Sequence, residues 1–187
     1  MRKPVSLCVA LFLLSAPGLC CSKQRGDIKQ LKDAGADRIN FTAKEVSVDW
    51  LASQARPEQV GAPGGASERV SPLETQVYRV RVKILKADEE HDGDYKLLVS
   101  AINDSTQVMV VEVPEADCVA TQHQGALRDV RHALDEAKNA GRLAATPIAT
   151  LEGVGYWGFV KPGQTAANGI ELHPVLKLEF EAASTVK

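Results

Sequence analysis

The feature that most constrains the fold is the pattern of apolar residues between positions 72 and 181. Along this stretch the pattern changes from that of β-strands to that of a helix and back to that of strands. Five segments show the apolar/polar alternation or the short apolar runs of β-strands. These segments are 76–86, 95–102, 107–113, 148–157 and 170–180. Between the third and the fourth, at 121–143, apolar residues recur at the spacing of one helix face. The sequence therefore predicts the element order β-β-β-α-β-β.

Short polar turns at 88–93 and 103–105 separate the first three predicted strands, which favours a meander. Three meandering strands, one helix and two further strands form the order of an OB-like barrel, a small five-stranded barrel. We therefore predict a mainly β fold with one helix, in which an OB-like β-barrel domain occupies residues 72–181. Residues 182–187 would be a short tail.

The preceding segment, residues 21–71, lacks such a pattern and is predicted to be a loosely structured lead-in and linker. Thr42 and Glu45 have the spacing of a capping box, which predicts a helix over about 43–54. The 61–71 stretch is rich in Gly, Pro, Ala and Ser and predicts a flexible linker.

The first 20 residues have the pattern of a secretory signal peptide. Arg2 and Lys3 precede an apolar stretch over 5–16, which is too short to span a bilayer as a helix. We therefore expect an exported protein, located in the periplasm or outside the cell. Cleavage before Leu19 and cleavage before Cys21 both remain open. A lipid anchor on one of the neighbouring cysteines is an alternative that would tether the protein to a membrane.

The cysteine positions suggest one disulfide. Cys8, Cys20 and Cys21 lie in the first 21 residues, and Cys118 is the remaining cysteine. In an oxidising compartment, either Cys20 or Cys21 can pair with Cys118 if it survives processing. If neither does, Cys118 is a single structural thiol.

Carboxylates and imidazoles suggest a metal site without a compact ligand motif. The candidate ligands are Asp92 and Asp94 in one turn and His173 in the last strand, and the candidate cofactor is a divalent cation. The alternative is a turn that uses its Asp and Gly residues only for backbone geometry. No other cofactor is predicted.

Aromatic residues near the fourth strand suggest a second kind of site. Tyr156 and Trp157, followed by Lys161, could contact a ligand from the barrel surface. Burial inside the barrel is the alternative. With 22 basic and 24 acidic residues the net charge is -2, which does not favour binding to a phosphate backbone.

Two stretches, 92–97 and 110–115, resemble the thermonuclease (staphylococcal-nuclease-like) OB barrel. The resemblance implies calcium-binding carboxylates at Asp94 and Glu112 and a general base at Glu115. It also places Gln107 where that family has a catalytic arginine, so the electrostatic stabilisation of phosphoryl transfer is incomplete.

A second resemblance spans about 71–180 and is most specific at 168–175, Asn-Gly-Ile-Glu-Leu-His-Pro-Val. The chain is similar there to uncharacterised exported bacterial proteins with an NGIELHPVL-type motif, although Lys96 stands where those proteins usually have a histidine. That family carries no established activity.

These observations predict a non-enzymatic binding or interaction module of the bacterial envelope or periplasm. Its partner would be an envelope protein, a peptide or a glycan rather than nucleic acid. The alternative is a divalent-metal-dependent phosphodiester hydrolase with a degenerate active site.

Overall fold

The computed structural model describes residues 21, 25–61 and 66–182. The signal-peptide prediction over residues 1–20 therefore lies outside the described residues. So do residues 62–65 of the predicted linker and residues 183–187 of the predicted tail. Within the described part of the chain, no helix has the length and apolar character needed to cross a membrane.

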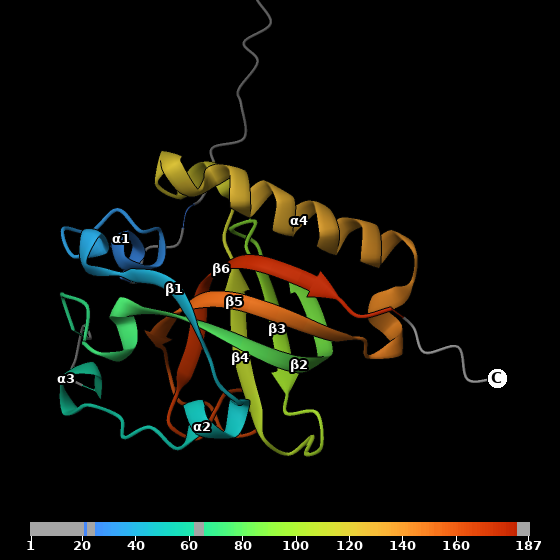
Figure 1. Cartoon of the computed structure of the whole chain (residues 1–187), viewed down its shortest axis with the longest axis horizontal. Helices are drawn as coiled ribbons and strands as arrows, with labels where there is room; N and C mark the ends of the chain where they lie inside the picture. The colour runs from blue at the N-terminus through green and yellow to red at the C-terminus, as the bar shows by residue number, and fades with distance from the viewer. Residues whose placement is uncertain (1–20, 22–24, 62–65, 183–187) are drawn as a thin grey trace, which may run out of the picture.

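Five strands close into a mixed β-barrel (Figure 1). They are β2 (Gln76–Glu89), β3 (Tyr95–Ser100), β4 (Val108–Val113), β5 (Ile148–Trp157) and β6 (Ile170–Phe180). The order is β2-β3-β4-β6-β5, and β5 pairs with β2 to close the barrel. Only the β4–β6 pairing within the barrel is parallel. The predicted mainly β fold with a closed five-stranded barrel is confirmed, and this order is consistent with an OB-like barrel.

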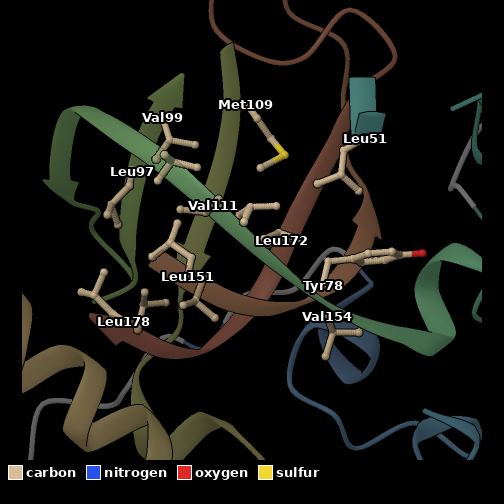
Figure 2. Close-up of a cluster of buried hydrophobic side chains, with 14 of the residues drawn as sticks. Leu51, Tyr78, Leu97, Val99, Met109, Val111, Leu151, Val154, Leu172 and Leu178 are labelled. Carbon is tan, nitrogen blue, oxygen red and sulfur yellow. The ribbon is translucent and has the colours of Figure 1, made fainter. Parts of the chain in front are cut away.

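The long strand β2 makes the closure possible because its two halves pair with different neighbours. Residues 77–83 pair with β5, and residues 83–89 pair with β3, with a register shift between Ile84 and Lys86. Such a bulge bends a strand and increases its twist, as a small barrel requires. The inward side chains form the core shown in Figure 2, which includes Leu97, Val111 and Leu172.

The main helix, α4 (Gln124–Asn139), joins β4 to β5 and lies along one side of the barrel, against β6 (Figure 1). Its buried residues are Leu127, Val130, Leu134 and Ala137. The predicted helix is therefore confirmed, although it is shorter than 121–143. The 3-10 turns η4 (Thr121–His123) and η5 (Arg142–Ala145) occupy the rest of that range.

The described part of the N-terminal segment is not loosely structured, so that prediction is wrong. It contains α1 (Gly26–Lys29), the 3-10 turn η1 (Ala36–Arg38), β1 (Asn40–Glu45), α2 (Val48–Ala52) and α3 (Glu58–Gly61). A second 3-10 turn, η2 (Leu73–Thr75), follows it and leads into β2. Leu31, Val48 and Leu51 join the same hydrophobic core as the barrel strands. Arg69, in the predicted linker, is 6% exposed and forms an ion pair with Asp33 at 2.6 Å.

The helix predicted over 43–54 is also wrong in its first half. Thr42 and Glu45 lie in strand β1, which pairs in parallel with β2. The helix begins instead at Val48, where the Ser47 hydroxyl accepts a hydrogen bond from the Trp50 backbone N–H at 3.0 Å. Backbone pairing with β2 thus replaces the local cap that the Thr42–Glu45 spacing suggested.

Candidate functional site

A group of polar side chains lies on the outer face of the barrel. Val111 and Leu172 pair across β4 and β6 and point into the core (Figure 2). Because side chains alternate along a strand, Glu112 and His173 point outward beside each other. We call Asp94, Lys96, Glu112, Glu171 and His173 the barrel-face cluster.

This cluster is buried although it faces outward, because the N-terminal segment packs against it. Glu112 and Glu171 are each 7% exposed, and His173 is fully buried. The Lys29 ammonium lies 3.4 Å from Glu112 Oε2 and 5.3 Å from the centre of the Tyr156 ring. The segment therefore brings positive charge to a face that carries three carboxylates.

Three members of the cluster present metal-ligating atoms to one another. One donor atom each from Asp94, Glu112 and His173 lies within 4.8 Å of the other two. His173 Nδ1 is 2.8 Å from Glu112 Oε2, yet neither imidazole nitrogen has a partner in hydrogen-bond geometry among the described residues. Asp94 is oriented by the Glu115 backbone N–H, which donates to Asp94 Oδ1 at 2.9 Å.

Two carboxyl groups of the cluster, those of Glu112 and Glu171, have pKa values shifted in opposite directions. Burial opposes ionisation of Glu112, but His173 and the ammonium groups of Lys29 and Lys96 outweigh it and hold the Glu112 pKa well below its usual range. Burial and the nearby Glu112 raise the pKa of Glu171 to about 8. At neutral pH, Glu112 is therefore ionised and Glu171 mostly carries a proton.

Asp94 and His173 have shifts of their own. Burial raises the pKa of Asp94 to about 6, although the hydrogen bond from the Glu115 N–H opposes the shift. Complete burial lowers the pKa of His173, with the Glu112 carboxylate acting in the opposite direction. A neutral imidazole leaves a nitrogen lone pair free to coordinate a cation.

Of the three metal ligands predicted from sequence, the structure brings together Asp94 and His173. Asp92 does not join them, because its carboxylate accepts a hydrogen bond from the Asp94 backbone N–H at 3.3 Å and so closes the turn. Glu112 takes the third position. Lys29 was not predicted, because nothing in the local pattern of the N-terminal segment indicates which face it covers.

The residues of the hydrolase hypothesis are neighbours, but the Glu115 carboxylate is paired with another side chain. Asp94 and Glu112 are together, but the Glu115 carboxylate forms an ion pair with Arg131 of α4 at 2.9 Å. The lysine and arginine side chains that pair with Glu112 in the described part of the chain are Lys29 and Lys96, so no guanidinium group is among them.

The aromatic residues predicted to contact a ligand are not available for stacking. Tyr156 is 3% exposed and Trp157 is 4% exposed. The Arg25 guanidinium lies 4.9 Å from the centre of the Tyr156 ring. The structure thus corrects the ligand-binding prediction for these two residues, whereas Lys161 is exposed as that prediction requires.

The loop that carries Lys161, residues 158–169, exposes two apolar side chains. Phe159 is 56% exposed and Val160 is 44% exposed. The Arg56 guanidinium donates hydrogen bonds to the carbonyls of Gly158 and Asn168, each at 2.8 Å. The loop is therefore fixed at both ends while its tip is presented to solvent.

A disulfide joins Cys21 to Cys118, with a Cα–Cα distance of 5.7 Å. Cys118 is 1% exposed. Cys20, the other predicted candidate, lies outside the described residues. The disulfide attaches the beginning of the described chain to the segment between β4 and α4.

Comparisons with known proteins leave the family open. No family model matches the chain, and no curated protein matches it in sequence. A search of solved structures found a chain described as a "putative aspartyl-tRNA synthetase" from Leishmania major Friedlin, with 12% identity and a TM-score of 0.41. The match covers 79% of this chain and 22% of that chain.

Proposed function

We propose that this protein is an exported, non-enzymatic interaction module that binds another protein or peptide of the cell envelope. The observation that carries the proposal is the 158–169 loop, in which Phe159 and Val160 are exposed on a backbone held by Arg56. Removing apolar surface from water contributes roughly 25 cal/mol per Å². A loop that is already ordered loses little conformational entropy on binding.

The exposed residues 159–161 of the loop favour a particular kind of partner surface. Lys161 is exposed next to the two apolar side chains, so a complementary partner offers an apolar patch beside a carboxylate. A glycan is less favoured, because the rings of Tyr156 and Trp157 are buried. The net charge of -2 argues against nucleic acid.

Export is supported by two independent features. The first 20 residues have the composition of a signal peptide, and Cys21 lies in disulfide geometry with Cys118. Disulfides persist in the periplasm and outside the cell and are rare in the cytosol. Retention of Cys21 in the mature chain is compatible with cleavage before Leu19 or before Cys21.

The hydrolase alternative has less support from the geometry. A phosphodiester would have to reach Asp94 and Glu112, which are 3% and 7% exposed, respectively, with the N-terminal segment packed over them. Calcium-dependent nuclease activity that is lost in Asp94→Ala would establish the hydrolase and overturn the non-enzymatic proposal.

The interaction proposal is tested by site-specific photo-crosslinking in the producing cells. A photoreactive phenylalanine at position 159 should give one discrete adduct, and Val160→Asp in the same chain should abolish it. The matched control carries the probe at Ser105, which is exposed in the turn between β3 and β4. Equal adduct patterns from the two positions, or no adduct from either, would rule out the loop as the contact.

A further inference from the structure

We infer that Asp94, Glu112 and His173 form a binding site for one divalent cation of the zinc class. The three ligands lie outside the 158–169 loop, and the inference does not depend on the proposed interaction function. Its three donor atoms come from the turn before β3, from β4 and from β6. They are gathered by barrel closure, because the parallel β4–β6 pairing places Glu112 beside His173.

The first observation is the spacing of the donor atoms. All three lie within 4.8 Å of one another, and His173 Nδ1 is 2.8 Å from Glu112 Oε2. Donors that share a zinc ion with bonds of about 2 Å lie roughly 3 Å apart. The barrel fixes the strands that carry Glu112 and His173. Rotation of the carboxylates would therefore bring the donor atoms from their present spacing to that of zinc ligands.

The second observation is the imidazole itself. His173 is fully buried, and neither ring nitrogen has a partner in hydrogen-bond geometry among the described residues. Buried polar atoms without a partner are rare and costly. His173 Nδ1 faces Glu112 Oε2 at 2.8 Å, so a cation that both groups ligate would replace this contact and satisfy both.

The nearby lysines offset charge but leave the coordination position open. Lys29 Nζ and Lys96 Nζ lie 3.4 Å and 3.6 Å from Glu112 oxygens, longer than the usual charge-assisted hydrogen bond. Both side chains are partly exposed, so their flexible stems can withdraw toward solvent. A bound cation would then compete with these ammonium groups, which limits its affinity.

The chemical nature of the three donor atoms indicates which class of ion can bind. One imidazole nitrogen and two carboxylate oxygens suit zinc and similar borderline cations, and three protein ligands leave a position for water. Calcium needs six to eight oxygen ligands, more than this set supplies. We therefore expect zinc to bind, with calcium and magnesium as much weaker competitors.

The test is calorimetric titration of zinc chloride into the full, chelator-stripped chain at pH 7. The wild type should bind one zinc ion per chain. Lys96→Gln should bind more tightly, on the order of tenfold, because it removes a competing positive charge. His173→Gln should weaken binding by about 100-fold or more. His132→Gln is the control, since His132 forms an exposed pair with Glu136 at 3.4 Å and should not affect the site.

Cobalt substitution gives a second readout, because visible absorption reports nitrogen and oxygen ligation directly. If circular dichroism shows that His173→Gln is unfolded, Asp94→Asn replaces it, and the effect of Lys96→Gln still decides the question. The inference is overturned if neither the wild type nor Lys96→Gln binds zinc. It is equally overturned if binding depends on His132 rather than on His173.

Discussion

Glu74 connects the N-terminal segment to the barrel, and its substitution should be among the most destabilising in the chain. Its side chain is fully buried and accepts two hydrogen bonds from Arg25, each at 2.7 Å. It also accepts the backbone N–H of Val70 at 2.7 Å and that of Trp157 at 2.8 Å. One carboxylate thus satisfies donors from three separate parts of the sequence.

Glu74→Met leaves the Arg25 charge, with a side chain 5% exposed, without its counter-ion. Removing one member of a buried ion pair costs about 3–5 kcal/mol, and each orphaned N–H adds to that cost. We expect the free energy of unfolding to fall by about 5 kcal/mol. Arg25→Met should cost less, about 3 kcal/mol at the lower end of that range, because the buried Glu74 carboxylate keeps both backbone donors.

Urea denaturation at pH 7, followed by far-ultraviolet circular dichroism, measures both variants. With a slope of about 2 kcal/mol per molar urea, the Glu74→Met midpoint should move by about 2 M or more. Glu179→Met is the matched control, because Glu179 is 53% exposed and forms only solvent-exposed ion pairs, with Lys177 at 2.9 Å and with Arg79 at 3.8 Å. A loss below about 1 kcal/mol for Glu74→Met, or a larger loss for Arg25→Met, would refute the reasoning.

Three further predictions follow from the same contacts. Because burial and Glu112 raise the pKa of Glu171 from 4.5 to about 8, its stabilising contribution is complete below pH 4.5 and is lost as the pH rises to about 8. In metal-free protein, Glu171→Gln should therefore flatten the fall in melting temperature over this range; an unchanged slope would contradict the assignment. Gly155→Ala should destabilise more than Gly158→Ala in urea melts, since its Cβ would lie 2.4 Å from the Leu73 carbonyl oxygen. The Gly158→Ala Cβ would instead meet the end of the Glu171 side chain at 1.9 Å, which can change rotamer more readily than a backbone carbonyl can shift, and the reverse order would count against this explanation. Reducing the Cys21–Cys118 disulfide, which spans 97 residues, should cost about 4 kcal/mol, whereas an unchanged melting temperature with reductant would show that the bridge is not formed.

The barrel strands were predictable because each shows, within its own residues, the apolar and polar pattern of a strand. The predicted bounds 148–157 and 170–180 agree with β5 and β6. The first strand was predicted to end at Lys86 but continues to Glu89, because β2 pairs there with β3 beyond its bulge. Local pattern indicates that a strand exists, whereas its length depends on the neighbour that it finds.

The N-terminal segment was mispredicted because distant polar contacts stabilise it. Arg69 reaches the Ile28 carbonyl and Asp33, and Arg25 reaches Glu74. A Gly- and Ser-rich stretch with a few charges gives no local indication of such buried pairs. Likewise, the hydrogen-bonding capacity of Thr42 and Glu45 suits a helix cap, but strand β1 forms there by pairing with β2.

The candidate metal site was only partly predictable. Asp94 was predicted as a metal ligand together with His173, and the hydrolase hypothesis named Asp94 together with Glu112. Their convergence depends on the parallel β4–β6 pairing, a contact between residues about 60 positions apart that no local period reveals.

Because the N-terminal segment covers the barrel face, an extended ligand and a single ion differ in what they must displace to bind there. OB barrels bind extended ligands across the face of their second and third strands. In the barrel of this chain the second and third strands are β3 and β4, whose outward side chains Lys96 and Glu112 belong to the barrel-face cluster, with Lys29 packed against Glu112. The covering segment is fastened by the Cys21–Cys118 disulfide and by the Arg25–Glu74 ion pair. An extended ligand would have to displace these contacts, whereas an ion needs only the movement of a lysine side chain. The two proposals are therefore compatible, because a macromolecule would contact the 158–169 loop and a cation would bind at the covered barrel face.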